Sequence, residues 1–372
     1  MIKTLGLYLH VPFCASKCRY CDFYSFAAGD EQMEAYTEAL CRSIRDWGAT
    51  CADYTVDTVY FGGGTPSLLG DARLVRVLDA ARGAFAIAPD AEITVECNPD
   101  SMDESLLDAL HRAGVNRLSV GVQSADEGEL RRLGRRHSFA QAVDAIRRAQ
   151  AAGFFNLSLD LMYGLPGQTE GQLWQSARAL LELNPAHLSV YALKLEEGTP
   201  LFLEHPTLPD EDAQADMYMS LCRLLEREGF EHYEISNWAK PGFRARHNAR
   251  YWDLSEYLGI GPSAHSLLNG KRFAYGRSVE DFVRGVPPTT EEDVEGFSPA
   301  LEYLMLTLRT SDGVSPKEFE ARFGQPFAPF ARMLARYEKP GLTKRQAGRW
   351  RLTESGFLVS NPILTDVLSA EE

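Results

Sequence analysis

Six short apolar runs alternate with longer helical stretches between residue 5 and about residue 235, and this alternation constrains the fold more than any other feature. The runs are rich in Val, Ile, Leu and Tyr, as strands of a parallel sheet buried on both faces usually are. Repeated strand–helix units predict a parallel α/β sheet whose crossovers share one hand. Six units are too few for a closed eight-stranded barrel, so we expect an open or partial one. The expected strands are residues 6–11, 56–61, 92–96, 117–122, 157–161 and 187–191.

The stretches between these runs carry helix start and stop signals. A Ser or Thr followed three residues later by Glu or Gln predicts a capping box, and a later glycine predicts the end of the helix. Such boxes are expected at residues 101–104, 138–141 and 169–172, with helix ends at Gly114 and Gly153. A further helix is expected from an apolar face at 3.6-residue spacing, formed by Leu74, Leu78, Ala81 and Phe85.

The pattern changes twice after residue 235. Glycine, proline, aromatic and basic residues crowd together in 236–290, and helical patterns return from residue 291. We therefore expect an α/β domain at 1–235, an irregular segment at 236–290 and a smaller helical domain at 291–372. Either a winged-helix-like domain or a helical cap over a sheet face fits the last part. Its expected helices are 301–308, 316–323, 329–337 and 353–359, with a strand at 349–352.

Composition narrows the classes of function. The formal net charge is −14, which argues against a general nucleic-acid binder, because phosphate contacts need a basic surface. No apolar run is long enough to cross a bilayer, and the apolar run at 5–10 is too short for a signal peptide. Seven cysteines without framework spacing fit reduced thiols, so we expect a cytoplasmic protein. We interpret Cys41, Cys51 and Cys222 as packing residues.

Residues that can carry chemistry follow most of the expected strands at their carboxyl ends, where parallel α/β folds place their sites. Consecutive glycines at 62–64 let a backbone approach a ligand closely and offer N–H donors. A simple strand-to-helix turn would explain them equally well, and the absence of a following Gly-Lys-Ser/Thr excludes a phosphate loop. The residues concerned are Cys14 after the first strand, Gly63, Gly64 and Thr65 after the second, Glu96, Gln123 and Asp160.

Three cysteines, Cys14, Cys18 and Cys21, lie at i, i+4 and i+7 in the loop after the first strand. Three thiolates at this spacing can hold three irons of a [4Fe–4S] cluster and leave the fourth iron open to a small molecule. Structural zinc needs four ligands, no second cysteine pair follows, and His10 could complete the set only by an unusual geometry. A disulfide would leave one thiol unpaired. The spacing therefore favours a 4Fe-4S cluster.

The cysteine loop resembles the radical S-adenosylmethionine (SAM) superfamily, in which the amino and carboxylate groups of SAM bind the open iron. Further motifs follow in one order, and together they resemble the oxygen-independent coproporphyrinogen III oxidase family, HemN and its relatives. These motifs are Tyr8-Leu-His-Val-Pro-Phe-Cys14, Phe61-Gly-Gly-Gly-Thr-Pro66, Glu96-Cys-Asn-Pro99, Gly121-Val-Gln-Ser124, Leu133-Gly-Arg-Arg-His137 and Asp160-Leu-Met-Tyr-Gly-Leu-Pro-Gly-Gln168.

That resemblance implies a partial (β/α)6 barrel of the radical-SAM type with a smaller C-terminal, winged-helix-like domain. It also implies that SAM contacts Tyr8, Gly63, Gly64, Thr65, Glu96, Gln123, Arg135 and Asp160, with Tyr20 near the adenine. Arg135 can offer a bidentate fork to a carboxylate, whereas Glu96 and Asp160 can accept from an ammonium or a ribose hydroxyl. Taken singly, each of these side chains would also fit an ordinary buried polar group or a surface ion pair.

Two departures from the oxidases point to the HemW branch of the family, whose members are regarded as haem chaperones. The oxidases carry another cysteine two positions after the third ligand, where this chain has Phe23. Its cysteine motif also starts at Cys14, which leaves no room for the long N-terminal segment of the oxidases. The segment His247-Asn-Ala-Arg-Tyr251-Trp252 fits the His-Asn-x-x-Tyr-Trp motif of HemW.

Haem, as cargo, would need an axial ligand, aromatic faces and cations for its propionates. His247 or His265 could supply the ligand, and which of them does so is open from the sequence. The aromatic faces would come from Tyr251, Trp252 and Tyr257. A locally basic stretch would supply the cations, namely Lys240, Arg244, Arg246 and Arg250.

Three functions compete on these grounds. The first is a haem chaperone that keeps a SAM-dependent cluster, lacks coproporphyrinogen oxidase activity and delivers haem to haem-requiring proteins such as respiratory ones. The second is an oxygen-independent coproporphyrinogen III oxidase, which would convert two propionates to vinyls. The third is RNA modification through the C-terminal domain, which Arg345, Arg349 and Arg351 favour and the overall acidity opposes. An electron donor such as a flavodoxin or ferredoxin is expected, and docking at the inner membrane face is compatible with the first function.

Overall fold

The computed structural model describes residues 3–290 and 298–371, and internal contacts divide the chain into two compact units. The first unit comprises Met1–Pro209 and Glu256–Glu292, and the second comprises Asp210–Ser255 and Asp293–Glu372. Residues 236–290 are thus shared between the units. The division at 235 and 290 that the sequence suggests stays a prediction.

All six expected strands are present in the first unit, and each is longer than its sequence pattern indicated. Neighbouring strands from β1 to β6 pair in parallel and in chain order. β4 is buried along its whole length, as expected of a strand covered on both faces. Their bounds are β1 Lys3–Val11, β2 Tyr54–Gly63, β3 Ala86–Cys97, β4 Arg117–Gln123, β5 Leu157–Tyr163 and β6 His187–Ala192.

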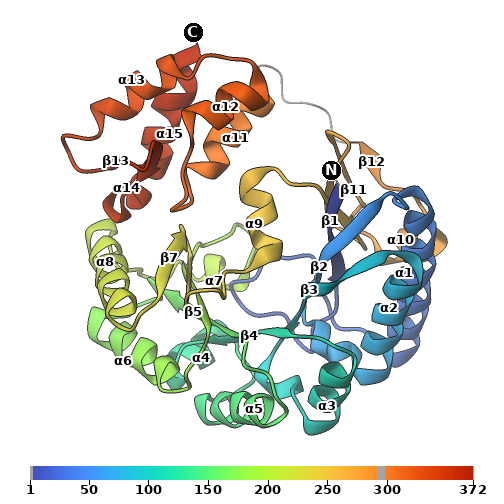
Figure 1. Cartoon of the computed structure of the whole chain (residues 1–372). Coiled ribbons are helices and arrows are strands. Elements are labelled where there is room, and N and C mark those ends of the chain that lie inside the picture. The colour runs from blue at the N-terminus through green and yellow to red at the C-terminus, as the bar shows by residue number, and fades with distance from the viewer. Residues whose placement is uncertain (1–2, 291–297, 372) are drawn as a thin grey trace. The chain divides into compact units, whose positions relative to one another are not determined.

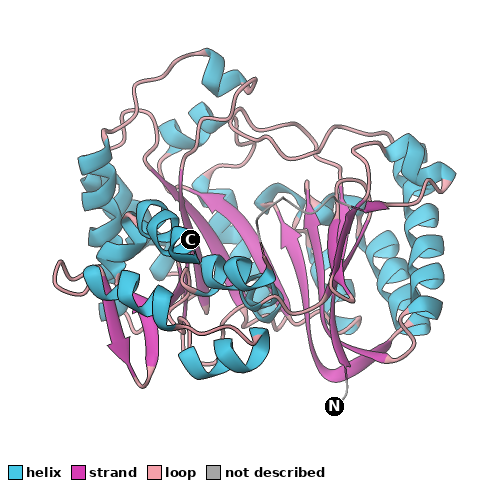
Figure 2. Ribbon diagram, turned by 90° about the horizontal axis from the view of Figure 1, so that it is seen from above, coloured by secondary structure: helices cyan, strands magenta, loops and turns pink. Residues whose placement is uncertain are grey.

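Helices cover the outer side of these strands, which gives the first unit the layered form of an open α/β barrel (Figures 1 and 2). The capping boxes at Ser138 and Thr169 are confirmed. The box expected at 101–104 is wrong, because Asp103 is the N-cap and its side chain accepts from the backbone of Leu106. The helices are α1 Asp30–Thr50, α2 Asp71–Ala84, α3 Glu104–Arg112, α4 Glu127–Leu133, α5 Phe139–Ala151, α6 Glu170–Leu181 and α7 Pro200–Leu203.

Residues 257–274 extend the sheet beyond β1, although the sequence indicated an irregular segment. Strand β9 (Tyr257–Ile260) pairs in parallel with β1, and β10 (His265–Leu268) and β11 (Lys271–Ala274) continue in antiparallel fashion. These strands are four residues long, so they leave little periodicity to read. The first unit also contains α10 (Val279–Arg284) and β12 (Thr289–Thr290).

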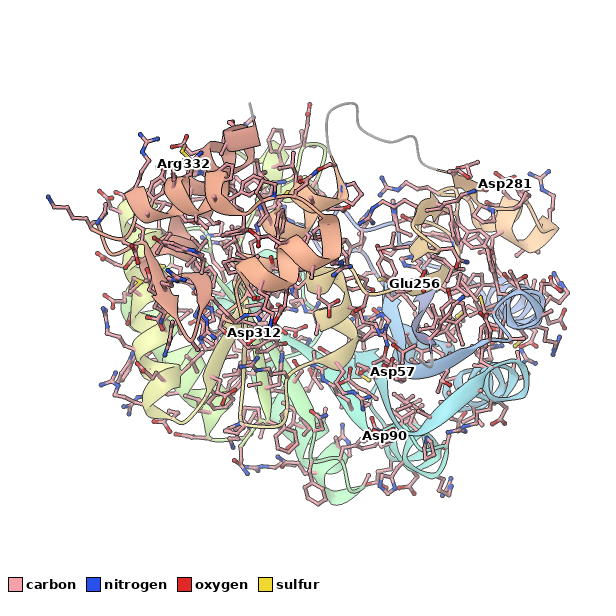
Figure 3. All side chains as sticks on the ribbon, turned by 45° about the horizontal axis from the view of Figure 1, so that its top comes forward. Asp57, Asp90, Glu256, Asp281, Asp312 and Arg332 are labelled. Atoms are coloured by element: carbon pink, nitrogen blue, oxygen red, sulfur yellow. The ribbon has the colours of Figure 1, made fainter. Side chains whose placement is uncertain are left out.

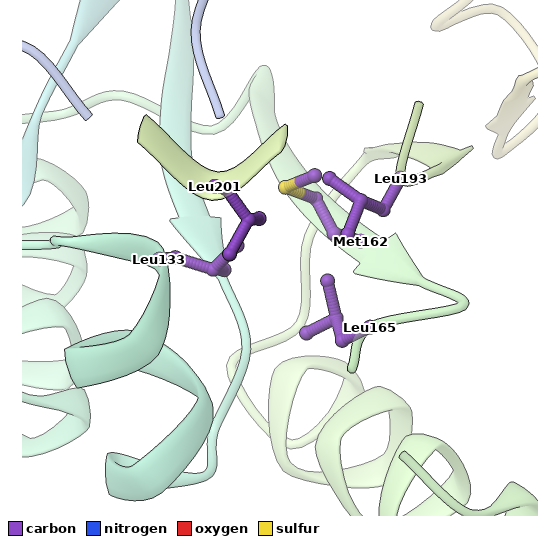
Figure 4. Packing of buried hydrophobic residues seen from close by; sticks show 5 residues of the cluster. All are labelled: Leu133, Met162, Leu165, Leu193 and Leu201. Atoms are coloured by element: carbon purple, nitrogen blue, oxygen red, sulfur yellow. The ribbon is translucent and has the colours of Figure 1, made fainter. Parts of the chain in front are cut away.

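A cluster of buried leucines and a methionine lies where α4, α7 and the ends of β5 and β6 meet (Figure 4). Leu201 of α7 is fully buried there. Tyr20 and Tyr191 pack against this cluster and also line the cavity described below. The cluster therefore supports one wall of that cavity. Its members are Leu133, Met162, Leu165, Leu193 and Leu201.

The second unit is mainly helical. The helices and the strand expected after residue 299 are present, with α12 and β14 matching their expected bounds. Strands β13 and β14 form an antiparallel hairpin, as the wing of a winged-helix-like domain would. No described helix is long and apolar enough to span a bilayer. The elements are α8 Glu211–Arg227, β7 Glu231–Glu234, β8 Asn237–Ala239, α9 Arg246–Asp253, α11 Pro299–Thr307, α12 Pro316–Phe323, α13 Ala328–Arg336, β13 Thr343–Gln346, β14 Arg349–Leu352, α14 Glu354–Leu358 and α15 Ser360–Leu368.

Candidate functional site

A cavity of about 360 Å³ opens at the carboxyl ends of the strands of the first unit. Its wall is formed by the loop after β1 and the ends of β2 to β6. The cavity brings together residues that lie far apart in the sequence, as the strand pattern predicted. The predicted site residues among its lining are Cys14, Cys18, Tyr20, Cys21, Gly63, Gly64, Thr65, Glu96, Gln123, Arg135 and Asp160.

The three cysteines of the loop after β1 are half-buried free thiols. Two of the sulfurs accept weak hydrogen bonds at 3.5 Å, Cys14 from the Thr65 hydroxyl and Cys18 from Arg135 Nη1. Burial raises the pKa of Cys21. Donors aimed at sulfur stabilise thiolates and the sulfurs of iron–sulfur clusters. The set of donors thus fits a cluster held by three thiolates.

The glycines after β2 are required by close packing. A Cβ on Gly64 would lie 2.6 Å from the carbonyl oxygen of Phe13. Gly63 has φ +117°, and its Cβ would meet the ring of His10 at 2.6 Å. The expectation that this turn offers free N–H donors is wrong. The amides of Gly63, Gly64 and Thr65 already donate to Glu96, Val11 and Phe13, respectively.

Two carboxyl groups lie on the cavity wall. Glu96 accepts from the Tyr60 hydroxyl at 2.7 Å and from the Gly63 amide at 3.1 Å, and burial raises its pKa. Burial, followed by the neighbouring charge of Glu96, raises the pKa of Asp160 to about 7. Near neutral pH the protonated and ionised forms of Asp160 are therefore similar in free energy. A cation in the cavity would favour the ionised form.

Arg117, which sequence reasoning did not single out, supplies a buried positive charge near these carboxyl groups. It is 2% exposed, and it lowers the pKa of both Glu96 and Asp160 against the effect of burial. Its Nε and Nη1 atoms have no hydrogen-bond partner among the described residues. Alternate residues of a regular strand share a face, so Arg117 lies on the face of β4 that carries Ser119 of the cavity wall. The two-residue alternation along this strand is the sequence signal that could have pointed to Arg117.

Gln123 ends β4 in a left-handed conformation, with φ 72°. Its side-chain oxygen accepts from the Tyr191 hydroxyl at 2.7 Å. A residue other than glycine in this conformation costs free energy and is often found at functional sites. Arg135 is held by bonds from Nη2 to Asn98 Oδ1 at 2.8 Å and to the Gly121 carbonyl at 2.6 Å. Its buried Nε has no partner among the described residues.

Tyr8 is the one predicted SAM contact of the first unit that is not part of the cavity wall described here. Its hydroxyl lies 3.1 Å from His10 Nδ1, and its ring stacks on Tyr60 at 6.1 Å. Its ring packs closely on Gly62 of β2, where a Cβ would lie 2.8 Å from it. Asn98, Tyr191 and Met162 line the cavity, and the sequence reasoning did not single them out.

The predicted axial ligand and aromatic residues of the second unit, His247, Tyr251 and Trp252, lie together on helix α9. His247 is 1% exposed, and its Nε2 is 3.0 Å from the hydroxyl of Tyr251. The two rings pack edge to face, with centroids 5.4 Å apart. Trp252 is half-buried. His265, the alternative ligand, is exposed in β10 of the first unit.

Arg244 of the basic stretch is already paired with acids, which its sequence neighbours do not show. Arg244 forms ion pairs of 3.2 Å with Glu231 and with Asp312, which is labelled in Figure 3. Arg250 is buried, and Lys240 lies over the ring of Phe230. The acids come from other parts of the second unit, so sequence neighbours alone could not reveal them.

The fold and the cavity define a protein of the radical SAM class. The model of the radical SAM superfamily matches residues 8–180, and that of the HemN C-terminal domain matches residues 299–359. The structure resembles the coproporphyrinogen III oxidase HemN from Escherichia coli, a radical SAM enzyme, with a TM-score of 0.86. The alignment covers 98% of this chain and 90% of that chain at 23% identity, so it shows the shared fold.

Two relatives named heme chaperone HemW give the finer assignment. The protein from Escherichia coli K12 is 37% identical over 98% of both chains. That from Bacillus subtilis 168 is 34% identical over 96% of this chain and 97% of its own. The chain belongs to the HemW family of the radical SAM superfamily.

Proposed function

We propose that this protein is a haem chaperone that binds a [4Fe–4S] cluster and SAM in the first unit, and that it binds haem and delivers it to haem-requiring proteins. The full-length likeness to proteins named heme chaperone HemW is the single observation that carries this proposal. The cavity supports the cofactor part, and the His247 motif supports the haem part.

The donor set of the cavity fits a cluster. Cys14, Cys18 and Cys21 would hold it, because they are the three free thiols of the cavity wall that lie on one loop. When bound, such a cluster supplies electrons and an iron open to a small ligand. Thr65 and Arg135 would donate to its sulfurs, as they already do to two of the thiols.

The polar wall of the cavity fits a zwitterion such as SAM. We propose that the guanidinium of Arg135, which lines the cavity, orients the SAM carboxylate, while Glu96 and Asp160 accept from the ammonium or the ribose. Gly63, Gly64 and Thr65 would shape the turn beside the methionyl end, and Gln123 would be held by Tyr191. Tyr20 would pack against the adenine. Tyr8 would support the glycine turn by packing on Gly62.

The haem site is proposed on helix α9. His247 would be the axial ligand, and the rings of Tyr251 and Trp252 would contact the macrocycle. Coordination through Nε2 requires that the His247–Tyr251 hydrogen bond opens, so a free energy of about 1 kcal/mol opposes binding. This cost would favour release of haem to a recipient of higher affinity.

Side-by-side incubation of anaerobically reconstituted protein with haem and with coproporphyrinogen III tests the proposal. We expect a saturable Soret shift at about one haem per chain and no vinyl product in the presence of SAM and reductant. The absence of saturation would reject the chaperone, and rapid product formation would instead establish the oxidase. Iron content is measured on the same preparation, because protein without a cluster would also form no vinyl product.

Variants locate the haem. Trp252→Ala removes a half-buried ring outside the His247–Tyr251 hydrogen bond, and we expect haem affinity to fall about tenfold. His265→Ala is the matched control, since that histidine is exposed on another element. A loss of affinity confined to His265→Ala would move the axial ligand to β10.

A further inference from the structure

Three potential metal ligands of the second unit lie close together outside the haem motif. They are Cys222 of α8, His232 of β7 and Glu354 at the start of α14. One ligand atom from each lies within 4.8 Å of the others. Figure 1 shows that α14 lies beside α8, although more than half of the second unit separates them in the sequence. These three residues thus come from both chain segments of the second unit.

One ring nitrogen of His232 is a buried polar atom whose bonding capacity is unsatisfied within the described part of the chain. His232 Nδ1 is buried and has no hydrogen-bond partner among the described residues. Buried polar groups are normally paired, so an orphan of this kind needs an explanation such as an ion. The other ring nitrogen, Nε2, lies 3.3 Å from the hydroxyl of Tyr218. A metal-bound histidine is usually held in this way by a second hydrogen bond.

The surroundings hold the imidazole ring in a fixed orientation. His232 stacks on Trp238 with a centroid distance of 4.1 Å and an interplanar angle of 8°, and Phe357 of α14 contacts it edge-on at 5.2 Å. Tyr218 also donates to the carbonyl of Ile235 at 3.2 Å. Rigid ligands with supporting contacts bind metals more tightly than mobile ones, because less side-chain entropy is lost.

The chemistry of the three side chains selects the ion. A thiolate, an imidazole and a carboxylate are ligands of zinc, which takes four ligands in tetrahedral geometry. A thiolate and a carboxylate together neutralise a divalent cation, so a buried site would carry no net charge. Tetrahedral zinc brings its ligand atoms to roughly 3.5 Å from one another, so the trio must contract slightly. The half-buried carboxylate of Glu354 can make that approach.

We propose that Cys222, His232 and Glu354 bind one zinc ion, with a water molecule or an incoming ligand in the fourth position. The ion would join α8, β7 and α14 and so fix the C-terminal segment on the rest of the second unit. The thiol proton is released to solvent when the metal binds. This site is independent of the cluster cysteines and of the proposed haem residues.

Equilibrium dialysis of the cluster-loaded full chain against chelator-buffered zinc tests the site, with zinc and iron measured by mass spectrometry. We expect one zinc per chain at unchanged iron content, and at least tenfold weaker binding in Glu354→Gln and Cys222→Ser. Tyr218→Phe should weaken binding about tenfold, because the hydroxyl near His232 Nε2 is lost. Cys51→Ser and Glu338→Gln are controls elsewhere in the chain and should bind as the parent does.

Two results would overturn the proposal. One is the absence of zinc uptake while iron is retained, and the other is equal affinity in the parent and in Glu354→Gln. Cys222 is buried, so its serine variant can fail to fold. Glu354→Gln and Tyr218→Phe decide the matter in that case, because neither removes buried apolar volume. Proton release of about one per zinc in the parent gives a second readout.

Discussion

The cavity of the first unit and helix α9 of the second unit both carry family motifs, yet their polar groups are satisfied in different ways. In the cavity, thiols, a strained Gln123 and the buried Arg135 line a common space, and Arg135 Nε has no partner among the described residues. On α9, His247 is buried and bonded to Tyr251. The first site is preorganised for a ligand, whereas the second must open to receive one. Substitution of a cluster ligand in the first site should therefore chiefly impair binding, and substitution of His247 in the second should chiefly impair stability.

The largest effect is expected at the cysteine loop. Cys18→Ser removes one of three thiolates and also the sulfur that Arg135 contacts, so the chain should retain little or no [4Fe–4S] cluster after anaerobic reconstitution. Iron analysis and the visible absorption spectrum measure this. Cys41→Ser, at a buried thiol in α1, is the matched control and should keep its cluster. Full cluster content in Cys18→Ser would refute the ligand assignment.

Substitutions on helix α9 should instead lower the stability of the protein. His247→Ala removes a buried ring together with its hydrogen bond, and we expect the free energy of unfolding to fall by about 2–3 kcal/mol. Tyr251→Phe should lower it by about 1 kcal/mol. Chemical denaturation measures both values. His265→Ala, at an exposed side chain, should change it by less than about 0.5 kcal/mol. If His247→Ala is as stable as the parent, the contrast between the two regions fails.

The glycine turn gives an intermediate effect. Gly64→Ala places a Cβ 2.6 Å from the carbonyl oxygen of Phe13, and we expect a loss of stability of about 1–3 kcal/mol. Gly83→Ala, in an exposed position of α2 with open space around it, should instead gain about 1 kcal/mol. Thermal unfolding of the two variants beside the parent compares them. Equal melting temperatures would mean that the cysteine loop adjusts freely.

The sequence predicted the six parallel strands and most of the cavity because period, caps and strand ends are local signals. Residues such as Glu96 and Asp160 came together because they lie toward the carboxyl ends of parallel strands of one sheet. Arg117 was overlooked because its effect on the pKa of the two carboxyl groups depends on its burial near them, which a local pattern does not reveal. The neutralisation of Arg244 by Asp312 and the extension of the sheet by β9 depend on pairings distant in sequence, which no local pattern encodes. The proximity of Cys222 to Glu354 likewise depends on a contact between residues distant in sequence.

The smallest effect, and the sharpest comparison, comes from two buried carboxyl groups. The pKa of Asp160 in the first unit and that of Glu234 in the second are both raised to about 7, in each case chiefly by burial. In an unfolded chain both would lie near 4. The folded state thus favours the protonated form, and this stabilisation is present at low pH and is lost as the pH rises from about 4 through 7.

Asp160→Asn and Glu234→Gln cannot ionise, so each should gain stability relative to the parent between pH 5 and pH 8. We expect a gain of about 1–2 kcal/mol, which is less than the full shift implies. Asp160 is partly exposed, and Glu234 accepts hydrogen bonds from Ser236 and Asn237 at its two oxygens, of which an amide keeps only one. Denaturation curves at several pH values measure the gain. Addition of SAM should reduce the pH dependence assigned to Asp160, because a bound cation stabilises its carboxylate. Glu234 bonds to the amide of Ser236, and SAM should leave its contribution unchanged. Equal responses of the two carboxyl groups to SAM would show that Asp160, like Glu234, has only a structural role.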